Sequence, residues 1–175
     1  MHSRPEEGEA SPRKLFFADV MLGKLARWLR ILGFDTLYGA PADLSEVQVL
    51  MSRGRIVLTR TRRWSGVYGV LILEANDPMA QLAEVARRVP LYEDEVRFLS
   101  RCVRCNVLIH DVPRSRVFGH VPDYTYETQE RFAQCPSCGR FYWAGSHPSR
   151  MQEHLQSTLR WKADSLRGPG NGPIR

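Results

Sequence analysis

Over residues 15–89, short apolar runs are separated by segments in which hydrophobic residues recur with a helical period. This pattern predicts strands separated by helices. Four short apolar runs are expected to be buried strands: residues 15–18, 36–38, 56–59 and 67–73. Between and after these runs, apolar residues recur every three or four positions, as on one side of a helix, and Gly33 is expected to end the first helix. Strands that alternate with helices predict an α/β fold with a parallel sheet.

Each expected helix begins next to an acidic residue. Asp19 follows the first apolar run directly. Asp43 has Glu46 three residues after it, as in a capping box, and Asp77 precedes Pro78, a residue favoured at the first helical position. Each acid therefore has an ordinary structural interpretation as a helix cap, which the spacing favours for Asp43 and Asp77 more than for Asp19.

A second interpretation brings the three acids together. The carboxyl ends of parallel strands meet at one edge of a sheet, so Asp19, Asp43 and Asp77 could converge there. Carboxylates in such a cluster would hold Mg²⁺ or Mn²⁺, which prefer hard oxygen ligands. One or two such ions can activate water and stabilise the charge on a phosphodiester during cleavage.

The charge of the chain fits an anionic partner such as nucleic acid. The formal net charge is +6, and residues 14–90 hold 11 Lys/Arg against 7 Asp/Glu. Cations gather in the stretch from Arg53 to Arg63 and recur every three residues in the first helix, at Lys24, Arg27 and Arg30. A merely basic surface is the competing interpretation. The expected phosphate contacts are Lys24, Arg27, Arg60, Arg62 and Arg63.

The four cysteines form two Cys-x-x-Cys pairs. Cys102 and Cys105 are separated by 29 residues from Cys135 and Cys138. This spacing predicts a structural zinc site, because four thiolates complete a tetrahedral shell and leave no open position for catalysis; a redox dithiol is the weaker alternative. His147 is interpreted as a packing or hydrogen-bonding residue rather than a fifth ligand.

The remaining segments have simpler expectations. Phe141–Trp143 is expected to be a strand, and a basic amphipathic helix is expected through Met151, Leu155 and Leu159. The composition of residues 1–13 and 164–175 predicts a disordered tail and a flexible tail. No apolar run reaches the length of a membrane helix and the start of the chain has no hydrophobic signal core, so we expect a cytoplasmic protein that does not bind membranes.

Two parts of the sequence resemble one known family. Residues 17–36, with the run Met-Leu-Gly-Lys-Leu-Ala-Arg-Trp-Leu-Arg, and residues 55–60 are similar to the Mut-seven C-terminal RNase domain family. The cysteine half is similar as well, in residues 100–106, 121–127 and 135–147. The resemblance implies a PIN-like nuclease domain over 14–92 and a zinc ribbon with a C-terminal helix over 98–160.

The resemblance also implies an activity and a set of site residues. Such a protein would be a metal-dependent ribonuclease, an RNA endonuclease with a Mg²⁺ or Mn²⁺ site besides the structural zinc. The positions that match the family's acids are Asp19, Asp43, with Glu46 as a helper, and Asp77. RNA would be the main partner, and the ribbon could also bind a protein.

One position departs from the family pattern. The third strand of the family typically ends Leu-Thr-Arg-Asp, whereas this chain has Thr61 in place of the acid. A hydroxyl cannot replace the charge that a carboxylate brings to a Mg²⁺ site. The alternative hypothesis is therefore an RNA-binding or regulatory module that keeps the fold and the ribbon with weakened or lost catalysis.

Overall fold

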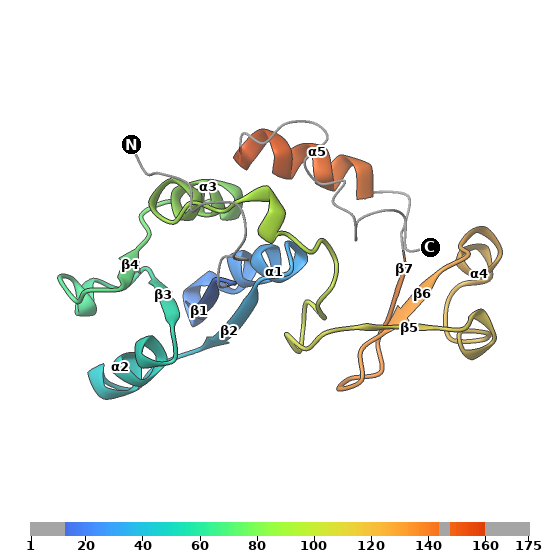
Figure 1. Cartoon of the computed structure of the whole chain (residues 1–175), viewed down its shortest axis with the longest axis horizontal. Helices are drawn as coiled ribbons and strands as arrows, with labels where there is room; N and C mark the ends of the chain where they lie inside the picture. Colours follow the sequence, from blue (N-terminus) through green and yellow to red (C-terminus); the bar gives the residue numbers. More distant parts are fainter. Residues whose placement is uncertain (1–12, 144–147, 160–175) are drawn as a thin grey trace.

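The computed structural model describes residues 13–143 and 148–159 and contains a four-stranded parallel sheet (Figure 1). The strand order is β2-β1-β3-β4, and every neighbouring pair is parallel. The strands are β1 (Leu15–Asp19), β2 (Asp35–Gly39), β3 (Arg55–Thr59) and β4 (Val70–Ile72). The α/β fold with a parallel sheet is thus confirmed.

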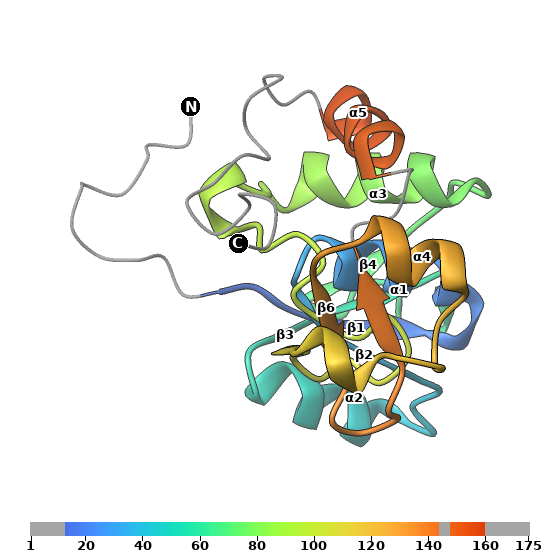
Figure 2. The ribbon, with the colours of Figure 1, turned by 90° about the vertical axis from the view of Figure 1, so that its right-hand side faces the viewer.

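Helices cover both faces of this sheet (Figure 2). The helices α1 (Gly23–Ile31) and α3 (Pro78–Arg88) lie on one face, and α2 (Leu44–Ser52) lies on the other. Successive side chains of a strand point to opposite faces, so Phe16 and Ala18 of β1 join the α1/α3 core while Phe17 packs with Val47 of α2 and Val57 of β3. The two faces therefore have separate cores.

Gly33 ends α1, as expected, and packs closely against the segment that leads to the cysteines. Its φ of +92° is unfavourable for other residues, and its N–H donates to the carbonyl oxygen of Arg30 at 3.0 Å. A Cβ at this position would clash with the carbonyl oxygen of Arg97. The connecting segment is packed rather than loose, because Val96 lies in the α1/α3 core and the Leu99 N–H donates to the carbonyl of Ile31 at 2.8 Å.

The fourth strand is shorter than the apolar run that predicted it. The expected strand covered residues 67–73, whereas β4 covers Val70–Ile72. Gly69 has a φ of +84°, so the chain turns there, after the short 3-10 helix η2 (Arg62–Trp64). Trp64, in η2, packs into the core on the α2 face of the sheet, with Phe17, Val47 and Val57.

The cysteine half forms a small antiparallel sheet beside the α/β part (Figure 1). Its strands are β5 (His110–Val112), β6 (Phe132–Gln134) and β7 (Phe141–Trp143), with the 3-10 helix η4 (Arg114–Arg116) and the short helix α4 (Asp123–Thr128) between β5 and β6. The expected strand at Phe141–Trp143 is confirmed.

The last helix, α5 (Pro148–Leu159), returns to the α/β part. It lies over α3 in Figure 2, and its Leu155 is fully buried in the α1/α3 core. The helix follows the cysteine half in the chain but packs against the α/β part. The expected tails lie outside the described residues, apart from Arg13, and so does His147. Within the described residues, no helix is long and apolar enough to cross a membrane.

Candidate functional site

Asp19 lies at the carboxyl end of β1, next to both β2 and β3. It is 6% exposed, its Oδ1 accepts a hydrogen bond from the Met21 N–H at 3.1 Å, and its Oδ2 accepts one from Thr59 Oγ1 at 2.7 Å. The strand order sends α1 and α2 to opposite faces, so β1 and β3 flank the switch point of the sheet. Ligands of open α/β sheets bind at such a point.

Thr59 is a partner of Asp19 that the sequence interpretation missed. It is fully buried at the end of β3, and its hydroxyl also accepts a hydrogen bond from the Thr61 N–H at 3.1 Å. Strand alternation could have revealed it, because Thr59 points to the same face as Val57, and Asp19 to the same face as Phe17. Thr61 itself caps η2, with Oγ1 accepting from the Arg63 N–H at 3.4 Å.

Asp43 caps α2 at the exposed surface. Its carboxylate accepts hydrogen bonds from Ser45 Oγ at 2.6 Å and from the Glu46 N–H at 3.0 Å, and these bonds lower the pKa of Asp43. Glu46 completes the box by accepting from the Ala42 N–H at 2.8 Å, one residue earlier than the usual reciprocal bond. The cap interpretation is confirmed without excluding a second role for the carboxylate.

Asp77 caps α3 in the same way, accepting hydrogen bonds from the backbone N–H groups of Met79 and Ala80 at 2.9 and 3.0 Å. In the part of the chain that the structure describes, Asp19, Asp43 and Asp77 do not form a group with ligand atoms close enough to share an ion. All three stand at helix starts that follow carboxyl ends of strands, but each keeps its own cap.

A hollow of about 360 Å³ opens beside Asp43, between α2 and the end of β2. Its lining is mostly apolar and includes Phe17, Pro41 and Val49, with Glu46 as its charged member. The hollow lies on the α2 face, the face to which Asp19 points.

The cations expected to contact phosphate have different environments. Lys24 and Arg27 are exposed on α1, and Arg63 is exposed with its guanidinium 5.5 Å from the centre of the Trp64 ring. Arg62 is exposed beside Glu74, at 3.6 Å. The half-buried Arg60 donates from Nη2 to Asn76 Oδ1 at 2.5 Å, while its buried Nε has no partner.

Arg30 does not share the exposed side of Lys24 and Arg27, contrary to the expectation. It is 7% exposed and bonds backbone carbonyls instead. Each step of three residues falls about 60° short of a full helical turn, so Arg30 has rotated about 120° from Lys24.

The four cysteines lie together. Within residues 13–143 and 148–159, they form the group of three or more potential ligands whose ligand atoms are close enough to one another to hold a metal ion. Their sulfur atoms lie within 4.8 Å of one another, and Cys102 Sγ is 3.8 Å from Cys138 Sγ. A tetrahedral zinc with Zn–S bonds of about 2.3 Å places sulfur atoms about 3.8 Å apart. The site fits a structural metal such as zinc.

The two knuckles have the same backbone geometry. The residue after each pair is left-handed, Asn106 with a φ of +66° and Gly139 with a φ of +70°. Each of these residues donates its N–H to the carbonyl of the first cysteine of its pair at 2.9 Å. Gly139 therefore serves the tight turn of the second knuckle, and Asn106 is its counterpart in the first.

Hydrogen bonds to sulfur prepare one thiol for metal binding. The Tyr142 hydroxyl donates to Cys102 Sγ at 3.0 Å, and the Cys105 N–H donates to it at 3.3 Å. Burial acts to raise the pKa of Cys102, but these bonds outweigh it and lower that pKa to about 6. Burial raises the pKa of Cys135 to about 11, so Cys102 is the first of the two to ionise.

Comparison with known proteins relates the chain to a protein family. The sequence model of the Mut7-C RNAse domain matches residues 14–155, which includes the parallel sheet, the four cysteines and most of α5. No curated protein and no solved structure matches the chain. The family points to a nuclease or RNA-related role. Since the match covers most of the sequence, the chain belongs to the Mut7-C RNAse domain family.

Proposed function

We propose that this protein is a metal-dependent ribonuclease whose reaction centre lies around Asp19, at the carboxyl edge of the parallel sheet. The observation that supports this most strongly is a carboxylate only 6% exposed at the switch point of the sheet, in a chain of an RNase family. Burying a carboxylate has a cost, and the hydrogen bonds from Met21 and Thr59 offset it.

The donor set around Asp19 is compatible with a Mg²⁺ or Mn²⁺ ion held partly by the substrate. Each Asp19 oxygen accepts one hydrogen bond in the structure and has a further lone pair. Mg²⁺ is commonly bound through one or two carboxylates together with substrate phosphates and water. Such an ion would supply an activated water and would stabilise the charge on the phosphodiester. Asp43 and Asp77 are the candidate additional ligands.

The chain's own residues would hold the RNA backbone near this point. Lys24 is in the first turn of α1, and Arg62 and Arg63 are in η2, and both elements follow strands at the carboxyl edge. Cations placed there would neutralise phosphates and make binding weaken steeply with salt. Arg27 and Arg60 would contribute from the neighbouring turns.

The direct test is cleavage of labelled single-stranded RNA by the full chain with Mn²⁺ or Mg²⁺. We expect Asp19→Asn to lower the rate by roughly 100-fold or more, since an amide cannot replace a charged metal ligand. Asp111→Asn, an exposed acid on β5 of the ribbon, is the matched control and should cleave as wild type does. The proposal fails if wild type does not cleave, or if Asp19→Asn cleaves as fast as wild type.

A second candidate function is RNA binding without cleavage, and Thr61 is the observation that favours it. The family pattern has an acid here, whereas the Thr61 hydroxyl caps η2 two residues from Thr59. An aspartate caps such a turn equally well, so Thr61→Asp is expected to fold. If wild type binds RNA without cleaving it and Thr61→Asp cleaves with Mn²⁺, the natural protein is the binding module.

A further inference from the structure

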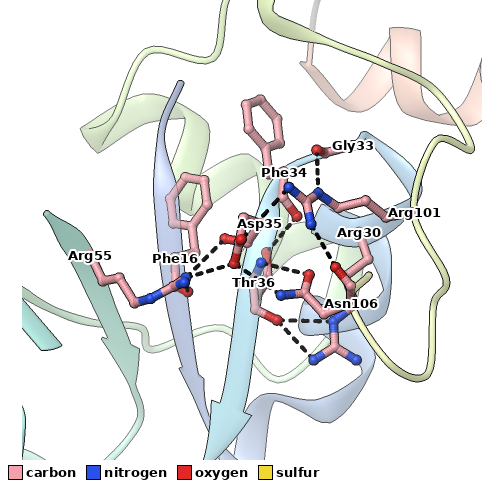
Figure 3. A network of polar contacts seen from close by, with 9 residues as sticks. All are labelled: Phe16, Arg30, Gly33, Phe34, Asp35, Thr36, Arg55, Arg101 and Asn106. Atoms are coloured by element: carbon pink, nitrogen blue, oxygen red, sulfur yellow. Dashed lines mark hydrogen bonds and ion pairs between the residues drawn. The ribbon is translucent and has the colours of Figure 1, made fainter. Parts of the chain in front are cut away.

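A network of polar side chains joins the edge of the parallel sheet to the first cysteine knuckle (Figure 3). Asn106, directly after Cys105, is 8% exposed, and its side chain points toward Asp35 and Thr36 of β2. Its Oδ1 accepts a hydrogen bond from the Thr36 N–H at 2.9 Å, and its Nδ2 donates to Asp35 Oδ1 at 2.9 Å. A residue of the knuckle therefore bonds both the backbone and a side chain of β2.

Arg30 reaches the same place from α1. Its Nε and Nη2 donate to the Thr36 carbonyl at 2.9 and 2.8 Å. Its Nη1 donates to the carbonyls of Val103 and Arg104, at 2.9 and 3.0 Å, and both lie between the two cysteines of the knuckle. One buried guanidinium thus connects β2 with the turn that carries Cys102 and Cys105. We call Arg30 and Asn106, together with the backbone of Thr36, the Arg30–Asn106 clamp.

The clamp covers an edge that the sheet leaves open. β2 pairs with β1 on one side and is the outer strand of the sheet. The N–H and C=O of Thr36, which is fully buried, are bonded by Asn106 and Arg30. A buried backbone group without a partner costs about 1–3 kcal/mol, so the edge depends on these two side chains.

Both halves of the clamp require a folded knuckle. The Val103 and Arg104 carbonyls accept from Arg30 only while the turn between Cys102 and Cys105 is formed. The left-handed φ of +66° that directs Asn106 toward β2 belongs to the same turn. A metal ion held by the four cysteines fixes this turn, because each knuckle presents two sulfur ligands to it.

We infer that metal bound to the four cysteines stabilises the β2 edge of the parallel sheet through the Arg30–Asn106 clamp, and that the clamp raises metal affinity in return. The two effects are one coupling and are equal in size by linkage. The ribbon metal is therefore a structural element of the α/β domain as well as of the ribbon. This inference does not depend on the proposed ribonuclease activity, and its test uses no RNA.

The first test follows amide hydrogen exchange by NMR in the full wild-type chain, with zinc bound and after removal by a chelator. The Thr36 amide should exchange roughly tenfold faster or more without zinc. The Leu58 amide, in the interior strand β3, is the reference that reports global unfolding. After zinc removal, the Thr36 amide is expected to exchange faster than the Leu58 amide. A Thr36 exchange rate that does not change when zinc is removed would overturn the inference.

The second test uses a pair of matched variants. Asn106→Gly removes the clamp side chain, keeps a residue suited to positive φ, and makes the first knuckle resemble the second, where Gly139 holds the same position. Gln134→Ala is the control, because Gln134 Nε2 donates at 3.0 Å to the carbonyl of Gly139 in the second knuckle and not to the α/β part.

Zinc affinity, measured by competition with a chromophoric chelator, should fall about tenfold in Asn106→Gly. In this variant the Thr36 amide should exchange fast even with zinc bound, and chelation should hardly change it. Gln134→Ala should keep the zinc-dependent protection of Thr36. Two results would overturn the inference: Asn106→Gly with wild-type zinc affinity, or Asn106→Gly with zinc-dependent protection of Thr36.

Discussion

The two candidate sites of this molecule differ in how completely their ligands are assembled. The four cysteine sulfurs lie within 4.8 Å of one another, on two turns of equal geometry. The acids at the sheet edge stand on three separate elements, and each bonds its own helix start. The cysteine site is formed by short local turns, whereas the acids of the sheet edge would need an ion and substrate to act together.

This difference determines what a single substitution at each site can show. Removing one cysteine should destroy a site that is already assembled. Removing one acid should affect a helix cap, a reaction, or both, and the two effects must be separated. The expected effects range from the loss of a metal site to the loss of a single helix cap.

The largest effect is expected from Cys135→Ser. A serine hydroxyl does not replace a buried thiolate as a zinc ligand, and in small metal modules the binding energy is also folding energy. Zinc affinity should fall by roughly 100-fold or more, and amides of β5–β7 should exchange as in an unfolded chain. Zinc content by mass spectrometry and hydrogen exchange measure this. Ser115→Ala, an exposed change in the same module, should behave as wild type, and stoichiometric tight zinc in Cys135→Ser would contradict the assembled site.

A smaller loss is expected from Gly33→Ala, at the contact between the two regions. The new Cβ would meet the Arg97 carbonyl, and the φ of +92° adds backbone strain. We expect a loss of about 3 kcal/mol in the free energy of unfolding, measured by denaturant titration. Gly54→Ala is the matched control, with a φ of +75° and nothing within 4 Å of the new Cβ, and should lose only about 1 kcal/mol. Equal losses in the two variants would show that the Arg97 contact is unimportant.

The sequence predicted the local features of both sites and missed what depends on tertiary contacts. Apolar periodicity and cap spacing located Asp19 at the end of β1, and Cys-x-x-Cys spacing located the cysteine cluster that could hold a metal ion, since both signals act over a few residues. Spacing also grouped Arg30 with the exposed cations of α1, and this was wrong. The acceptors of Arg30 in the knuckle lie 73 and 74 residues away in sequence, where no periodicity could indicate them.

Asp35→Asn tests the electrostatic part of the contact between the regions. Burial acts to raise the pKa of Asp35, but hydrogen bonds from Arg55 and Asn106 and the charges of Arg55 and Arg101 outweigh it and lower the pKa. A lowered folded-state pKa stabilises the protein above the unfolded pKa near 4, and this stabilisation is lost as pH falls through the folded value. Asp35→Asn should therefore lose about 2 kcal/mol at neutral pH.

The pH dependence distinguishes this charge effect from simple loss of packing. The difference in unfolding free energy between Asp35→Asn and wild type should begin to shrink as pH falls below about 4, where the carboxylate of the unfolded chain takes up a proton, and should vanish as pH falls through the lowered folded pKa. Denaturant titrations across that range measure it. Asp94→Asn, an exposed acid of the connecting segment, serves as the control and should show no such difference. A difference that stays constant with pH would assign the effect of Asp35→Asn to geometry instead.

The smallest effect on stability is expected at Asp77, and it bears most directly on the edge site. Asp77→Ala removes two hydrogen bonds at the start of α3 and should cost about 1 kcal/mol. Asp77→Asn should cost almost nothing, because asparagine caps a helix as well as aspartate does, although it carries no charge. If Asp77 only caps α3, Asp77→Asn keeps both stability and RNA cleavage; if it also holds a metal ion, cleavage falls while thermal unfolding stays at the wild-type temperature. The same pair of substitutions at Asp43 separates the two roles there, and a site whose three acids all tolerate asparagine would have no metal-dependent reaction at this edge.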